Sequence, residues 1–535
     1  MVTRTRQSKK LISILINLLL LGGSCSLFAG DLQLNSNVSS TAILYETKIN
    51  DETDYTSNQA LVIKPQLSTV YTSKGLKGSI LAEHTFVEQK DDREGADKSF
   101  TDLEYNSQLT LIENAMYIGI QGNQSYRVIS QIQEGIGDKI LAPGELTKYR
   151  RNGANFRFNI PNPKYIGLSM QTQYSEVKTD ESLDSFSGLD TKNISSSVNL
   201  FQGRNARGYR FNISGQSRRS ERSLFNDFTS NNINGLIGLS IGDKTDFVIT
   251  GNISEYDIDR ETSTSTRIGL DTNSYGAGFE WMPSAGRNIR LTYNQLEQFD
   301  QKTQFIGLNA GWAFSTRTAI SLDIGKQFYG NSYKFSLNQR LKHFSVSMDY
   351  NESVTSYGLL NTDVIPSLFV CSLGSTELAD CFQADSTDYE LQAGEVFLPV
   401  NLFETNISEE VFLRKAGSFS LGYQKRKVKI SIASSYGKTE YLESDRELAN
   451  RKVSLNISYQ LGRKSDISVS SGLSRRSTAE SIKDDTIKTL QVSYTRNLTQ
   501  KMKLDLTVRA LDRKSESLDR DLSDNRLSAG LNYTF

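Results

Sequence analysis

Apolar and polar residues alternate along much of this chain. In the last segment, one parity holds Leu527, Ala529, Leu531, Tyr533 and Phe535, and the other holds Arg526, Ser528, Gly530, Asn532 and Thr534. A two-residue period places the two sets on opposite faces of a β-strand. The same period recurs at 320–324, 344–350, 453–461 and 502–509. The pattern predicts strands that have one apolar and one polar face.

The polar face carries charges of both signs, as at Lys503, Asp505 and Arg509. Charges of this kind are costly in a packed apolar core but suit the watered interior of a membrane barrel. Segments of about ten residues with this alternation are typical of outer-membrane strands. We therefore predict an all-β, antiparallel transmembrane β-barrel in the outer membrane of a Gram-negative-type bacterium, with its apolar face toward membrane lipid.

Two classes of connection separate the strands. Short turns are expected at 74–77, 114–115, 162–164, 242–244, 284–288, 425–427, 462–465 and 499–501, and longer polar loops at 91–98, 133–147, 177–191 and 218–230. Outer-membrane barrels place their short turns at the periplasmic end. The segments add up to about 24 strands, within a range of about 22 to about 26, and leave no length for a separate plug domain. An even number would put both ends of the barrel in the periplasm.

The two ends of the chain have recognisable patterns. Residues 1–29 have a basic start (Arg4, Arg6, Lys9 and Lys10) and an apolar run from Leu11 to Leu21, which is too short to span a bilayer as a helix. This segment is expected to be a signal peptide, cleaved after Ala29 in preference to Ser26, which leaves 30–535 as the barrel. At the other end, Tyr533 and Phe535 lie on the apolar parity. We expect them to form the signal that barrel-assembly machinery recognises.

Composition supports this interpretation. Hydrophobic residues make up 37% of the chain, with 24 Tyr and 25 Phe but only 7 Pro, a profile that is rich in strand formers and unlike that of disordered chains. Lys plus Arg number 61 and Asp plus Glu number 61, so loss of the four basic residues of the signal leaves 57 against 61. Without a basic surplus, nucleic acid is not an expected partner.

One long acidic loop interrupts the alternation, at about 357–406. It contains Asp363, Glu377, Asp380, Asp385, Asp388, Glu390 and Glu395. Cys371 and Cys381 also lie there, and an even pair in an exported chain suggests a disulfide, the alternative being two free thiols. A loop of this length signals function or disorder. It could fold over the pore as a gate or extend outside the barrel.

Candidate chemistry is sparse. His84 and His343 are the only histidines, and neither has further His, Cys or carboxylate residues at the spacing of a metal site. No catalytic, metal or cofactor-binding residue is therefore assigned. Gly238 to Gly242 spell G-x-S-x-G, but a nucleophile elbow needs a following helix. No enzymatic activity is expected, and His84 is the single residue that would support the alternative of a barrel hydrolase.

Aromatic residues near the strand ends are expected to form the interfacial girdles of the barrel. They include Tyr71, Phe86, Tyr117, Tyr165, Tyr423, Tyr436 and Tyr533. A sugar-stacking track would require them to point inward, whereas most share the apolar parity.

Four segments carry a family resemblance. They are Glu280-Trp281-Met282-Pro283-Ser284, Phe328-Tyr329-Gly330-Asn331-Ser332-Tyr333, Glu409-Glu410-Val411-Phe412-Leu413-Arg414-Lys415 and Asn525-Arg526-Leu527-Ser528. On these the chain resembles the PEP-CTERM system-associated outer-membrane β-barrel family. The resemblance implies a role beside exosortase and exopolysaccharide loci, with exopolysaccharide and periplasmic export proteins as partners, and it supplies no catalytic residues.

The expected function is a porin-like conduit or an accessory for exopolysaccharide or matrix export, because a wide polar barrel is suited to passing hydrated cargo. The alternatives are a non-conducting barrel that scaffolds periplasmic partners and, through His84, a hydrolase.

Overall fold

A computed structural model provides the fold of the protein. It describes residues 30–535 apart from 51–53, 91–97, 129–138, 140–145, 181–189, 224, 259–269, 299–300, 357–368, 373–380, 384–394, 398–409, 444–445, 479–480 and 516–520. The expected signal peptide at 1–29 lies outside the described residues. No helix in the described part of the chain is long and apolar enough to cross a membrane.

Strands make up the described structure. The first half contains β1 (Asp31–Ile49), β2 (Thr56–Thr72), β3 (Leu76–Gln89), β4 (Lys98–Ile112), β5 (Met116–Val128), β6 (Leu146–Asn159), β7 (Ile166–Thr179), β8 (Asp190–Gln202), β9 (Tyr209–Arg222), β10 (Phe228–Gly242), β11 (Thr245–Ile258), β12 (Thr272–Ser284) and β13 (Arg287–Gln298). The second half contains β14 (Gln301–Ser315), β15 (Thr318–Gln327), β16 (Gly330–Arg340), β17 (Phe344–Ser356), β18 (Phe369–Ser372), β19 (Cys381–Gln383), β20 (Glu395–Phe397), β21 (Val411–Lys425), β22 (Val428–Tyr441), β23 (Glu447–Gln460), β24 (Ser465–Thr478), β25 (Ser481–Asn497), β26 (Met502–Ser515) and β27 (Leu522–Thr534).

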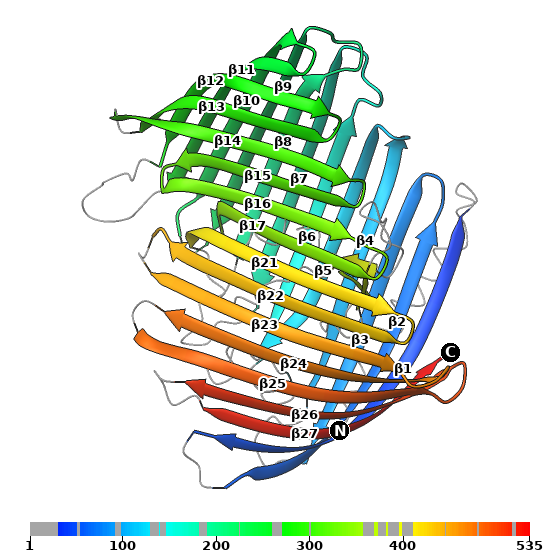
Figure 1. Ribbon diagram of the computed structural model, residues 1–535. Helices are drawn as coiled ribbons and strands as arrows, with labels where there is room; N and C mark the ends of the chain where they lie inside the picture. The colour runs from blue at the N-terminus through cyan, green and yellow to red at the C-terminus, as the bar shows by residue number, and fades with distance from the viewer. Residues whose placement is uncertain are drawn as a thin grey trace.

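The main sheet closes on itself as a barrel. It has 24 strands, in which β1–β17 and β21–β27 each pair antiparallel with the next, and β27 returns to pair with β1 from Asn37↔Thr534 to Ile49↔Leu522. Figure 1 shows these strands as one tilted wall with both chain ends near each other. Closure removes the free edges of the sheet, and every strand is held by a neighbour on each side. The predicted fold class and strand number are confirmed.

The alternation of the sequence becomes two faces of this wall. Leu527 and Leu531 of β27 point outward, half-exposed, and their register partners Val508 and Leu504 lie on the same face of β26. Large apolar residues at the same parity are exposed on strands all around the ring. In a membrane this face contacts lipid, whose hydrocarbon takes the place of a protein core.

Tight turns connect the strands at the end where both termini lie. Asn114 (φ 58°), Asn162 (φ 53°) and Gly286 (φ 72°) take the left-handed backbone conformation there, which asparagine and glycine tolerate best. All the expected short turns are found at this end, which is therefore periplasmic. Phe535 donates its backbone N–H to Ser36 at 3.0 Å and is exposed on the outward face beside Tyr533. The role of this pair in assembly stays a prediction.

The opposite, outer end differs from the expectation in detail. The expected loop at 218–230 is shorter, because β9 continues to Arg222 and β10 already begins at Phe228. The segment at 177–191 likewise shortens, since β7 ends at Thr179 and β8 begins at Asp190. Cross-strand pairing extends these ladders into polar sequence that alternation alone had assigned to loops.

The long acidic loop contains a second, small sheet of β19, β18 and β20. Its register places Cys371 directly opposite Cys381. Opposed residues of antiparallel strands have Cα atoms about 4.5 to 5.5 Å apart, within the range that a disulfide requires. The backbone is thus compatible with the predicted bond, which stays a prediction. Beyond these two sheets the described residues form no further domain.

Outward aromatic residues cluster near the periplasmic end, as the girdle prediction requires. Trp281 and Trp312 lie with ring centroids 5.9 Å apart, and Phe344 and Tyr423 with centroids 4.7 Å apart. Tyr117 is an exception to the prediction. Its neighbour Ile118 is exposed on the outward face, and Arg157 of the inner wall stacks over the Tyr117 ring at 5.3 Å, so Tyr117 faces the lumen.

Candidate functional site

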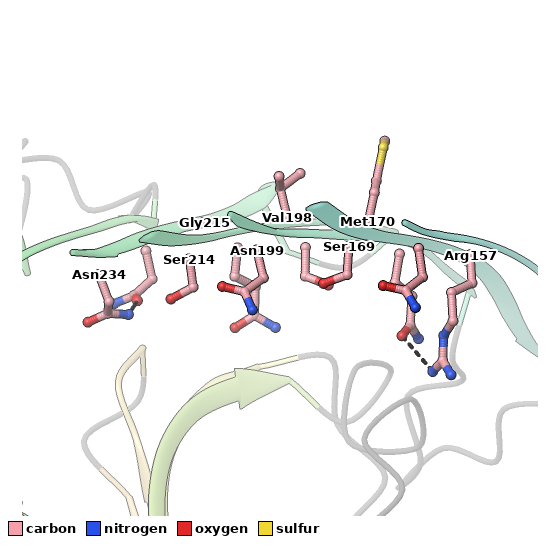
Figure 2. Close-up of a pocket in the computed structure, with 13 residues that line it drawn as sticks. Arg157, Ser169, Met170, Val198, Asn199, Ser214, Gly215 and Asn234 are labelled. Carbon is pink, nitrogen blue, oxygen red and sulfur yellow. Dashed lines mark hydrogen bonds between the residues drawn. The ribbon is translucent and has the colours of Figure 1, made fainter. Parts of the chain in front are cut away.

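The lumen is the candidate site, and the middle of its wall is neutral across β7–β10. Side chains of one row are register partners from strand to strand: Gln171, Ser197, Gln216 and Asn232. A second row next to it runs through Ser169, Asn199, Ser214 and Asn234. Figure 2 shows Ser169, Asn199, Ser214 and Asn234 projecting to one side of the sheet, while Val198 and Met170 point to the other. The rows line a hollow of about 510 Å³.

Amide and hydroxyl groups of this wall bind one another. Asn232 donates to Ser254 Oγ at 2.6 Å, and Asn252 donates to Asn234. Arg157 closes one end of the first row, donating to Gln171 Oε1 at 2.9 Å. The hollow therefore offers both donors and acceptors, with charge confined to its margin.

A charged network lies toward the periplasmic end of β9–β13. Arg210 forms ion pairs with Asp246, at 3.4 Å, and with Glu280, and Arg290 approaches Glu280 at 3.8 Å. Arg210 lies on β9 and Asp246 on β11, so the first pair reaches across β10. Gly238 permits this, because a Cβ there would lie 3.2 Å from Asp246 Oδ2. The G-x-S-x-G match is thus a strand end that makes room for an ion pair and then enters a turn.

On β25–β27 the inner wall is charged, and its charges are paired. Arg513 donates to Asp485 at 2.7 Å, and Arg526 lies 2.8 Å from Asp524. Arg513 and Asp524 are fully buried. The expectation that such charges would sit in a watered lumen is wrong at these positions: near the outer end, buried ion pairs replace water as the partner of each charge.

Apolar residues also occupy inward positions near the outer end. One cluster on β1–β4 consists of Ile43, Tyr45, Ala60, Val62, Val87 and Phe100, all buried. Lys139, in the loop between β5 and β6, lies 4.8 Å from the Phe100 ring and 2.9 Å from Asp102 Oδ2. On this side of the barrel, the inward positions near the outer end are therefore apolar and buried, whereas the alternation predicts polar residues on the inward face.

A second buried cluster, which we call the mouth cluster, joins distant strands. It contains Phe228 of β10, Leu270, Val354 of β17, and Val411 and Leu413 of β21, with Tyr256, Phe328, Tyr329 and Leu442 packed against it. Its members come from β10, β11, β17 and β21, from the β15–β16 turn, and from single positions just before β12 and just after β22. Contact between these strands at one end of the barrel narrows the outer mouth.

The parity of these residues shows how the contact forms. Val354 shares parity with Phe344 and Met348, which are exposed on the outward face, yet it packs against the inward-facing Phe228. The ladder of β17 with β16 stops at Phe335↔Tyr350, while its ladder with β21 continues to Ser356↔Val411. The outer end of the β17–β21 ribbon thus leaves β16 and bends inward over the lumen.

An ion pair bridges the mouth. Arg222, at the outer end of β9, donates from both terminal nitrogens to the two carboxylate oxygens of Glu443, each at 2.9 Å. Glu443 follows β22 and also accepts the backbone N–H of Val411 at 2.7 Å. In the ring, β9 and β22 are separated by β10–β17 and β21 in one direction and by β23–β27 and β1–β8 in the other, so this buried pair connects opposite walls. We call it the mouth bridge.

The residues considered for catalysis lie apart from these features. His84 is on the outward face of β3, with its ring 4.2 Å from Phe86 and Nδ1 2.7 Å from Thr101 Oγ1. His343 is in the periplasmic turn before β17, with Nδ1 3.0 Å from the Gln424 carbonyl. Within the described part of the chain, His, Cys, Asp and Glu form no group that could hold a metal ion.

The structure brings together two of the segments that carry the family resemblance. Phe328 and Tyr329 begin one segment, and Val411 and Leu413 belong to another; all four are in or against the mouth cluster. Arg222, Glu443 and Phe228 were missed from sequence, because each gains its role only from a partner on a distant strand.

Comparisons with known proteins add the following. No family model matches the chain, and no characterised protein matches its sequence. Among solved structures, the FrpB iron transporter of Neisseria meningitidis (F5-1 variant) has a TM-score of 0.45 and 8% identity, covering 94% of this chain and 82% of that one. The siderophore receptor PirA of Acinetobacter baumannii has a TM-score of 0.40 and 8% identity, covering 93% and 80%. The copper transporter OprC has a TM-score of 0.39 and 8% identity, covering 94% and 81%.

The fold itself assigns the compartment. A closed ring of 24 antiparallel strands with an apolar outward face, aromatic residues near its periplasmic rim and short turns at one end has the features of barrels that span the bacterial outer membrane. This protein is an outer-membrane β-barrel.

Proposed function

We propose that the barrel is a gated conduit whose outer mouth is closed by the mouth bridge and the mouth cluster. The observation that carries the proposal is the Arg222–Glu443 pair, which joins opposite walls above a neutral, hydrogen-bonding lumen. A barrel that only scaffolds partners has no need for a polar hollow beneath such a closure. Arg222 and Glu443 lose their hydration on burial, and their two parallel hydrogen bonds offset that loss. The pair can therefore hold the closure and still separate without unfolding the barrel.

The cargo that we propose is exopolysaccharide. The resemblance to PEP-CTERM system-associated barrels supports this choice, and the amide and hydroxyl wall supports it independently, because polysaccharide both donates and accepts hydrogen bonds. Export would then require periplasmic partners to deliver the chain and to shift the mouth toward its open state.

Current through planar bilayers tests the conduit. Arg222→Met removes the mouth bridge while keeping much of the side-chain length, and we expect it to raise the open probability about tenfold or more over wild type, since each 1.4 kcal/mol lost from the closed state is a factor of ten. Arg219→Met is the matched control. Arg219 lies on the same strand and pairs with Asp227 at 3.0 Å, but on the exposed side.

Two results would oppose the proposal. Equal currents for Arg222→Met and Arg219→Met would show that the bridge does not close the pore. Absence of current even in Arg222→Met combined with Phe228→Ala, with both proteins folded, would favour the alternative of a non-conducting scaffold.

A further inference from the structure

The neutral rows across β7–β10 mark a binding surface on one side of the lumen. Neither row contains a charged residue, and the rows continue onto β11 through Ser254 and Asn252, the register partners of Asn232 and Asn234. Adjacent strands are about 4.8 Å apart, so the two rows extend over roughly 20 Å from β7 to β11. That length accommodates several sugar rings laid across the strands.

The chemistry of the rows is selective. An amide offers two N–H donors and a carbonyl acceptor, and a serine hydroxyl does both, so the surface can pair with groups that also donate and accept. A polyol has such groups at every ring, whereas a polyether only accepts. Charge at the margin comes from Arg157 at one end and Arg218 next to Gln216 toward the outer side. Two guanidinium groups there disfavour a cationic chain.

The inner wall of β26 and β27 lacks these properties. On β26 and β27 the inward positions include Lys503, Asp505, Arg509, Asp524 and Arg526, and several of these are engaged in local pairs, such as Asp505 with Thr495 at 2.7 Å and Arg526 with Asp524. Hydrogen bonds between charged groups are stronger than those between neutral groups, so a neutral sugar displaces the paired charges of β26 and β27 less readily than the amide and hydroxyl contacts of β7–β10. A neutral chain in the lumen therefore meets more favourable partners on β7–β10 than on β26 and β27.

We propose that the β7–β10 wall is a binding track for a neutral glycan, in which Gln171, Ser197, Asn199, Ser214, Gln216 and Asn234 exchange hydrogen bonds with sugar hydroxyls. This deepens the proposed function by specifying that the glycan is neutral and which strands of the pore hold it, and so it rests on that function for its biological meaning. The track contains no aromatic platform among its rows, so hydrogen bonding and not ring stacking carries recognition.

Equilibrium binding to the purified, detergent-solubilised full-length barrel tests the track without any need for conduction. The probes are maltohexaose, a polyethylene glycol of similar length, and the cationic glucosamine hexamer. We expect maltohexaose to bind, and the other two to bind at least tenfold more weakly. The variant Asn199→Leu/Asn234→Leu should weaken maltohexaose about fivefold to a hundredfold, as expected for two lost hydrogen bonds of about 0.5 to 1.5 kcal/mol each.

Asn532→Leu is the matched control, because Asn532 faces inward on β27 opposite Lys503. It should leave maltohexaose binding unchanged. The proposal is overturned if maltohexaose does not bind, if the three probes bind equally, or if Asn532→Leu weakens binding as much as the double variant. Binding with these preferences but without current in the Arg222→Met variants would support the track and contradict the conduit. Current without saccharide binding would support the conduit and contradict the track.

Discussion

The inner face of this barrel has two regions that share one strand pattern and differ in environment. On β10, Phe228 at the outer end and Asn234 in the middle face inward with the same parity. Phe228 is fully buried in the mouth cluster, whereas Asn234 lines an open hollow. Parity therefore decides only which side of the wall a residue occupies. What it meets there depends on strands far away in the sequence.

Truncation at these two positions should give the largest contrast. Phe228→Ala removes a buried ring and should lower the free energy of unfolding by about 3 to 5 kcal/mol, while Asn234→Ala on the same face should cost less than about 1 kcal/mol. Urea titrations in phospholipid vesicles, followed by the fluorescence of Trp281 and Trp312, measure both. Equal losses would mean that the outer end is no more packed than the middle.

The mouth bridge should show a somewhat smaller effect. Arg222→Met or Glu443→Gln alone leaves a buried partner unpaired and should lower the free energy of unfolding by about 3 kcal/mol. The double variant should recover part of that loss. Arg219→Met, on the exposed pair of the same strand, should cost less than about 1 kcal/mol. The same titrations provide the double-mutant cycle, and strictly additive losses would contradict a direct interaction across the lumen.

Two glycines on β10 test the packing around the Arg210–Asp246 pair. A Cβ at Gly238 would press on the Arg210–Asp246 pair, so Gly238→Ala should cost about 1 to 2 kcal/mol. Gly235 has nothing within 4 Å of an added Cβ, and Gly235→Ala should be neutral or slightly stabilising. Thermal unfolding of the two variants measures the difference. A neutral Gly238→Ala would show that the ion pair tolerates displacement.

The smallest effect is expected at the cysteine pair. If the opposed Cys371 and Cys381 are bonded, a thiol reagent should find no free thiol in unfolded, unreduced protein and two after reduction. Because their small sheet is separate from the barrel ladders, Cys371→Ser/Cys381→Ser should change barrel stability by less than about 0.5 kcal/mol. Two reactive thiols before reduction would refute the bond.

The barrel could be predicted from sequence because its signals are local. Alternation at Leu527, Ala529 and Leu531 fixes the lipid face, and residues such as Asn114 and Asn162 fix turns within a few positions of themselves. The neutral wall could be predicted only in part. The alternation predicts which of its residues are polar and face inward. The neighbours within each row follow from strand pairing, which aligns residues such as Asn199 and Ser214.

By itself, then, the sequence determined the strand number, the two faces of the wall, the periplasmic turns and the outward end at Phe535, since each depends on contacts within a strand or between neighbours. The inward bend of the β17–β21 ribbon and the contact of Arg222 with Glu443 depend on the tertiary structure alone. These contacts join residues separated by many strands, and closing the barrel is what brings them together. The two-residue alternation contains no information about which distant strands come into contact.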